Sequence, residues 1–327
     1  LFAPYLSKLT KKNIDRSKTT AWSTRKSDTL YIFIDVIFPV LLVFIVGFII
    51  QKKFSVDIKA ISTIVVYLFM PCLVFRTLMT TEFDREYAFM IVFAISLLLL
   101  TVTIVKVYAA IRKLPQAVES GLILASGFMN AGNHGSPIIL FAYGETAFQY
   151  AITFFVFSSI LLNSIGLFFA ARGKMSVQLA LKAIFKMPMI YAVLLALLFQ
   201  FAPISFPENI FSIISFVADA SIPCVMVTLG MQLAQIRLNN INWEFISAAT
   251  VIRLFIAPLM AFFLVSLFIY DPLMKKVLIL LTALPTASAA TIFAVQFDTK
   301  PELVSSATFI STIVSIVTIT FLIAILG

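Results

Sequence analysis

The sequence has little of what soluble, metal-binding and disulfide-stabilised proteins use. Only 12% of its 327 residues are charged, against about a quarter in a typical soluble domain. It contains one histidine, His134, and two cysteines, Cys72 and Cys224, both inside apolar stretches. This supply offers no disulfide framework and no zinc-site spacing, so we expect no metal site and no cofactor. With 61% apolar residues and a mean hydropathy of +1.06, the chain is predicted to be an integral membrane protein.

Ten stretches are long and apolar enough to cross a bilayer as helices, which takes about 20 residues each. They are 33–50, 59–79, 88–108, 119–144, 147–171, 188–202, 208–233, 243–269, 276–296 and 303–326. Each stretch is continuously apolar and lacks the alternation of barrel strands. The prediction is therefore an all-α polytopic membrane protein with ten transmembrane helices and no separate soluble domain.

Basic residues exceed acidic residues, 24 against 15. Lysine and arginine of membrane proteins collect in cytoplasmic loops, so this surplus indicates topology and not a nucleic-acid partner. The segment 172–187 contains four basic residues and no acidic residue. This predicts a protein of the cell membrane in which 172–187 is a basic cytoplasmic loop and both termini face away from the cytoplasm. Residues 1–30 form a basic N-terminal extension. Its charges favour a cytoplasmic N-terminus, contrary to this topology, and we interpret it as a cleaved or membrane-surface segment.

An internal repeat divides the chain. Residues 54–79 align without gaps to residues 206–231, with Pro71-Cys72 matching Pro223-Cys224. Apolar matches between membrane helices also arise by chance, which is the alternative, so the shared Pro-Cys pair carries the inference.

The repeat predicts two five-helix halves, 31–171 and 188–327. Because five is odd, the halves must cross the bilayer in opposite senses. Inverted repeats of this kind are typical of secondary transporters, whose binding site lies near the bilayer midplane where discontinuous helices meet.

The fourth stretch is interrupted by the polar segment 130–137, Asn-Ala-Gly-Asn-His-Gly-Ser-Pro. Pro137 removes a hydrogen-bond donor and clashes with the preceding turn. Irregular backbone at membrane depth is tolerated only where it is buried in protein or lines a wet cavity. A break exposes N–H groups that attract anions and C=O groups that attract cations. We predict a carboxylate site from Asn130, Asn133, Gly135, Ser136 and Pro137; the alternative is a kinked packing helix.

The ninth stretch contains a second weak point at Pro285. Thr286 and Ser288 follow it among alanines, and we expect both hydroxyl groups to face the same cavity. Runs of Ser, Thr and Ala are also common at helix packing faces, which is the alternative reading.

These residues resemble the auxin efflux carrier family of membrane transporters over residues 33–327. Asn130, Gly135, Pro137 and Tyr143-Gly144 are similar to the family pattern Asn-x4-Gly-x-Pro-x5-Tyr-Gly. Asp219-Ala220 and Leu229-Gly230 resemble its seventh helix, and Ala283-Leu284-Pro285 resembles its second crossover region.

The resemblance implies a fold similar to the bile acid:sodium symporters, with two inverted repeats and broken helices 4 and 9 that cross where they unwind. It implies a scaffold from helices 1, 2, 6 and 7, a mobile transport domain from helices 3–5 and 8–10, a homodimer, and a carboxylate-binding role for Asn130. The plant members differ in two respects, because Ala290 stands where they have a second proline and residues 89–105 contain no acid. Their coupling scheme is therefore not carried over.

Three ionisable residues inside the apolar stretches are candidates for coupling, because such residues are costly in lipid. Asp219 is expected either to carry a proton or to brace the scaffold. Arg253 is expected to attract the anion, to pair with an acid such as Asp219, or to extend toward an interface. His134 titrates near neutral pH, which suits a proton switch, although a lone histidine is more often a satisfied polar side chain.

The sequence therefore predicts a secondary active transporter of small organic anions, working by elevator-type alternating access and driven by protons or the membrane potential. It contains no phosphate-binding loop, no H-E-x-x-H and no Ser/His/Asp constellation, so neither ATP-driven transport nor an enzyme is expected. The alternatives are a sodium-coupled organic anion symporter of the bile acid type and a membrane sensor that does not transport.

Overall fold

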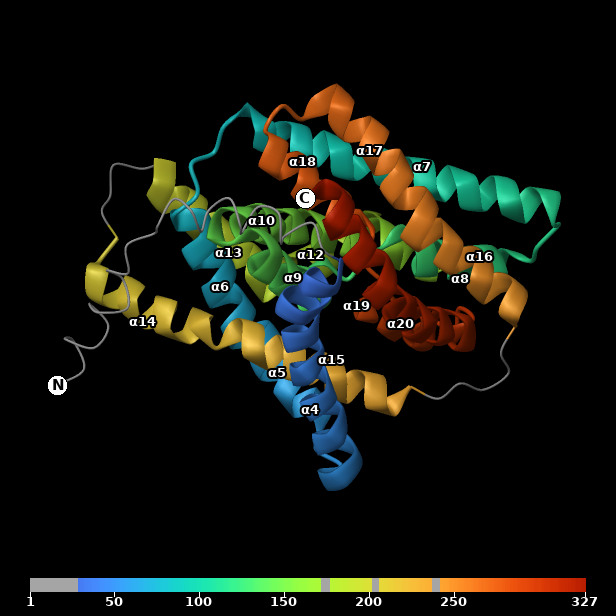
Figure 1. Ribbon diagram of the computed structural model, residues 1–327, viewed down its shortest axis with the longest axis horizontal. Helices are drawn as coiled ribbons and strands as arrows, with labels where there is room; N and C mark the ends of the chain where they lie inside the picture. Colours follow the sequence, from blue (N-terminus) through green and yellow to red (C-terminus); the bar gives the residue numbers. More distant parts are fainter. Residues whose placement is uncertain (1–28, 172–176, 202–205, 237–241) are drawn as a thin grey trace.

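A computed structural model describes residues 29–171, 177–201, 206–236 and 242–327 (Figure 1). The described residues form helices joined by short connections, and they contain one isolated β-bridge but no strand. This confirms the all-α prediction. The first 28 residues of the predicted extension and residues 172–176 of the predicted loop lie outside the described residues.

Seven helical stretches of the described chain are long and apolar enough to cross a membrane. They are Thr29–Phe54 (α3 Thr29–Ile32, η1 Phe33–Ile37, α4 Phe38–Phe54), Ile58–Met79 (α5 Ile58–Ile64, η2 Val65–Phe69, α6 Met70–Met79), Arg85–Ile111 (α7), Glu145–Ala170 (α10 Glu145–Leu161, η4 Leu162–Gly166, α11 Leu167–Ala170), Glu208–Gln235 (α14 Glu208–Asp219, α15 Ser221–Gln235), Trp243–Phe268 (α16 Trp243–Val251, η5 Ile252–Ile256, α17 Ala257–Phe268) and Pro301–Leu326 (α20). The chain is therefore a multi-pass membrane protein.

Seven shorter helical elements of the described chain lie outside these stretches. The fourth stretch comprises α8 (Gln116–Gly127), η3 (Ala131–Gly135) and α9 (Ser136–Tyr143), and the ninth comprises α18 (Pro272–Thr282) and α19 (Ser288–Gln296). The sixth stretch is α13 (Pro188–Phe201). A helix that was not predicted, α12 (Val177–Phe185), occupies part of the segment 172–187, because its sequence has no Gly or Pro to end a helix.

Proline accounts for four of the five π-helical turns in the described chain. The α-helix that follows η1, η2, η3 or η5 has proline as its second residue, at Pro39, Pro71, Pro137 and Pro258 respectively. Proline cannot donate to the carbonyl four residues earlier, and its ring pushes that carbonyl away. The wider π turn accommodates the displaced group without ending the helix.

Glycine permits close contact between α4 and α15, which cross in the lower part of Figure 1. A Cβ atom at Gly47 would collide with the carbonyl oxygen of Val227, and one at Gly230 would collide with the carbonyl oxygen of Phe44. Each glycine therefore lets the other backbone approach, as small residues do between membrane helices. Beside this pair, α6 packs against α13 and α14.

Candidate functional site

The two interrupted stretches meet at their breaks. The Asn130 N–H donates to the Pro285 carbonyl at 2.9 Å, and the Ala287 N–H donates to the Phe128 carbonyl at 2.9 Å. These bonds form the isolated antiparallel bridge between Met129 and Thr286. Each break thus provides hydrogen-bond partners for backbone groups that the other break leaves unpaired. Backbone at membrane depth requires such partners.

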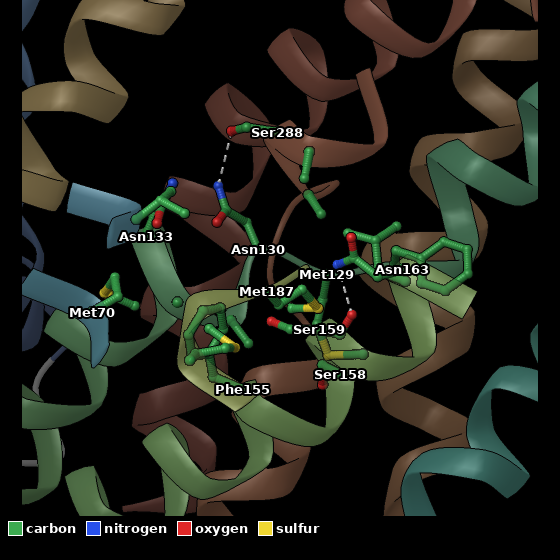
Figure 2. A pocket seen from close by; sticks show the side chains of 18 of the residues that line it. Met70, Met129, Asn130, Asn133, Phe155, Ser158, Ser159, Asn163, Met187 and Ser288 are labelled. Atoms are coloured by element: carbon green, nitrogen blue, oxygen red, sulfur yellow. Dashed lines mark hydrogen bonds between the residues drawn. The ribbon is translucent and has the colours of Figure 1, made fainter. Parts of the chain in front are cut away.

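A cavity of about 380 Å³ lies against this crossing (Figure 2). One wall comes from residues 127–133 and 287–289 of the two breaks, and another from α10 and η4. Residues of α5, η2, α6, α7 and α15 also line it, together with residues 186–189, which lead from the end of α12 into the start of α13. The cavity therefore lies between the broken helices and the group formed by the second and seventh stretches.

Two half-helices present their N-terminal ends to the cavity. The η3–α9 unit begins at Ala131 and α19 begins at Ser288, and the first residues of both line the cavity. First-turn N–H groups have no partner within their helix, and each N-terminus carries about half a positive elementary charge. The crossing therefore favours an anion at this wall.

Asn130 joins the two breaks through its side chain as well as its backbone. It precedes η3, and its carbonyl accepts the N–H groups of His134 and Gly135 at 3.3 and 3.0 Å. Its Nδ2 donates to the Ser288 hydroxyl at 3.3 Å (Figure 2). Asn130, Asn133 and Ser288 all line the cavity, so the structure brings together three of the seven predicted binding residues.

The other four predicted residues lie behind the cavity wall. The Ser136 hydroxyl donates to the Gly132 carbonyl, and the Thr286 hydroxyl donates to the Ala125 carbonyl. Pro137 is buried in the first turn of α9. A Cβ atom at Gly135 would collide with the Leu284 side chain across the crossing. These residues fix the backbone of the breaks and do not face the cavity.

Residues 32–323 match the membrane transport protein family. The chain belongs to this family. The match covers most of the sequence and agrees with the resemblance to auxin efflux carriers. A small-molecule substrate and a membrane environment follow for this membrane transport protein.

Three relatives resemble the chain at comparable distance. Uncharacterized transporters of Methanothermobacter thermautotrophicus and Methanocaldococcus jannaschii are each 27% identical to it, over 80% and 87% of this chain and 87% and 96% of their own. A protein of Rhizobium meliloti named "Putative malonate transporter" is 25% identical over 80% of this chain and 84% of its own.

Arg253 of this membrane transport protein does not line the cavity and does not pair with Asp219. It lies in η5, is 1% exposed, and donates to the Ser126 carbonyl at 2.8 Å and the Thr282 carbonyl at 2.6 Å. Ser126 belongs to the last turn of α8 and Thr282 ends α18. The guanidinium thus connects the C-terminal ends of the two half-helices that precede the breaks.

Asp219 and His134 are also placed outside the cavity lining. The Asp219 side chain is 71% exposed and forms an ion pair with Arg76, which also donates to the Ser215 carbonyl at 3.3 Å. His134 is 2% exposed, lies against the Phe44 ring with 5.4 Å between centroids, and its Nδ1 has no hydrogen-bond partner within the described chain. Packing of α6 against α14 brings Arg76 to Asp219, a contact that the amino-acid sequence alone does not indicate.

Several polar residues of the cavity were not predicted: Ser158, Ser159, Asn163, Lys186, Thr228 and Gln232. Asn163 donates to the Ser159 carbonyl at 2.9 Å, one turn away in the fifth stretch (Figure 2). The clustered polar residues in Ser-Ser-Ile-Leu-Leu-Asn-Ser, 158–164, were an available signal within an otherwise apolar stretch. No such sequence signal identifies Lys186, because its position beside the cavity depends on how α12 and α13 pack against the other helices.

Proposed function

We propose that this protein is a secondary active transporter of small organic anions that binds a carboxylate where the two broken stretches cross. The observation that carries the proposal is that two half-helix N-termini and Asn130 face one cavity. Family membership supplies the transport function. The printed name of the Rhizobium meliloti relative, which refers to malonate, is consistent with a carboxylate substrate.

The chemistry of binding follows from the donors at the wall. A carboxylate accepts hydrogen bonds from the amides of Asn130 and Asn133, from the Ser288 hydroxyl and from first-turn N–H groups. These donors are neutral, so at this wall the anion is attracted by helix dipoles and not by an oppositely charged side chain. Any carrier must bind its substrate weakly enough to release it. Gly135, Ser136, Pro137 and Thr286 support the geometry from behind.

The proposal includes ten membrane crossings in two inverted five-helix repeats. Seven long helices, α13 and the two interrupted stretches make ten. Helix contacts support the repeat because they occur in related pairs. The α4–α15 contact of helices 1 and 7 corresponds to the α13–α6 contact of helices 6 and 2, and α8–α20 corresponds to α18–α10.

The cavity supports an elevator-type movement in a cell membrane. Its lining combines helices 2 and 7 of the proposed scaffold with helices 4, 5 and 9 of the proposed transport domain. Sliding of one group against the other would carry the site across the bilayer. We further propose a homodimer, both termini outside the cytoplasm, and driving by protons or the membrane potential, with Asp219 and His134 as the titratable candidates.

Binding tests the proposal first. Purified protein is screened by thermal shift against mono- and dicarboxylates at two pH values, and carboxylates that stabilise it are then tested for uptake into proteoliposomes. We expect stabilisation by at least one carboxylate and not by its amide analogue. Stabilisation without uptake would instead support a membrane sensor, and binding of neutral compounds alone would contradict an anion site.

A further inference from the structure

Arg253 is a charge deep inside the helical bundle that pairs with no carboxylate of the described residues. It lies at the middle of Trp243–Phe268, is 1% exposed, and forms no ion pair within the described chain. A lone buried charge is costly in a protein and more so in lipid. The fold must therefore compensate the guanidinium in another way.

The compensation comes from two helix ends. Arg253 donates to the carbonyls of Ser126 and Thr282 at 2.8 and 2.6 Å, in the last turns of α8 and α18. Each helix C-terminus carries about half a negative elementary charge. Two such ends together balance one guanidinium, and the fork of Arg suits two acceptors at once.

In transporters with broken helices, half-helix C-terminal ends and unwound carbonyls are the groups that coordinate a coupling sodium ion. Here the guanidinium already bonds one carbonyl at each of the two ends.

We infer that Arg253 is a built-in cation that takes the place of a coupling sodium ion at the crossing. It neutralises the C-terminal ends of α8 and α18, which leaves the N-terminal ends of η3–α9 and α19 as the uncompensated positive poles that face the cavity. The anion site is thereby complete without a bound cation. Arg253 is a positioning residue and does not contact the substrate.

This inference rests on the proposed function, and the sodium requirement of the wild-type protein tests it directly. Carboxylate binding is measured by thermal shift, and uptake in proteoliposomes, with sodium chloride replaced by choline chloride. We expect affinity and initial rate to agree within twofold in the two media. A tenfold loss in choline would overturn the inference while leaving anion transport intact, whereas absence of carboxylate binding in both media would overturn the proposed function.

Variants test the residue itself. Arg253→Met removes the charge at similar length, and Arg253→Ala leaves room for a free guanidinium ion. We expect Arg253→Met to weaken carboxylate binding at least tenfold in choline, and Arg253→Ala to recover binding when guanidinium chloride is added at millimolar, non-denaturing concentration. Arg112→Met, which removes an exposed arginine paired with Glu244, is the matched control and should bind as wild type.

Rescue separates a cation role from a merely structural one, because a missing packing contact is not restored by a soluble ion. Arg253→Lys keeps the charge and should retain more binding than Arg253→Met. Wild-type affinity of Arg253→Met in choline would overturn the inference. If the neutral variants do not fold, the sodium dependence of the wild-type protein still decides.

Discussion

The peptide N–H of Asn130 donates to the carbonyl oxygen of Pro285 over 2.9 Å. These residues belong to different halves of the chain, so neither half can form the crossing alone. The bond lies in the wall of the cavity, next to the side-chain contact between Asn130 and Ser288. The position of the proposed carboxylate donors therefore depends on the pairing of two breaks.

Asn130→Ala should weaken carboxylate binding by about ten- to hundredfold, since it removes a hydrogen bond to a charged group worth about 1.5–3 kcal/mol. Isothermal titration measures the affinity, and thermal unfolding checks that the fold persists. Asn163→Ala is the matched control: Asn163 lines the same cavity but bonds within its own helix. Equal losses in both variants would argue against a special role for Asn130.

Pro137→Ala should slow transport by roughly an order of magnitude, because the hydrogen-bond donors at the cavity wall would be misplaced. Alanine restores an N–H that can bond the Asn133 carbonyl, so the π turn at η3 can close into regular helix. The measurement is initial uptake per reconstituted protein. Pro39→Ala changes a proline in the same position after η1, away from the crossing, and should transport normally; a wild-type rate for Pro137→Ala would make the π turn incidental.

Gly230→Ala should destabilise the protein by about 1–3 kcal/mol because the new methyl group meets the Phe44 backbone. A backbone carbonyl in a packed helix cannot move aside as a side chain can. Thermal unfolding in detergent measures the effect. In the control Gly127→Ala the nearest atom is a Leu98 methyl group at 3.2 Å, so a smaller change is expected, and equal stability of the two variants would contradict the packing argument.

Lys186→Gln should lower the affinity for carboxylates about two- to fivefold, the usual range for an exposed charge. Among the described residues that line the cavity, Lys186 is the one with a charge. The loss should shrink as ionic strength rises, because salt screens exposed charges. Lys182→Gln removes a neighbouring exposed lysine of α12 that does not line the cavity; an equal effect there would indicate a general surface charge effect.

The sequence indicated the local features well because proline and glycine act on their own backbone. Pro137 and Pro285 mark both breaks, and Asn130 and Ser288 lie beside them in the structure. Features that depend on helix packing could not be predicted from the sequence. Apolar periodicity does not show which helices touch, so the Arg76–Asp219 pair and the partners of Arg253 were missed. For the same reason Thr286 was expected in the cavity, although it bonds the Ala125 carbonyl.

The bridge between the breaks is built from peptide groups alone. Any amino acid except proline can supply the N–H groups at positions 130 and 287, and any residue can supply the carbonyls at 128 and 285. Side chains around the cavity can therefore be exchanged without disrupting the backbone bridge that positions them. Evolution can retune selectivity at such a site by single substitutions, and so can protein engineering.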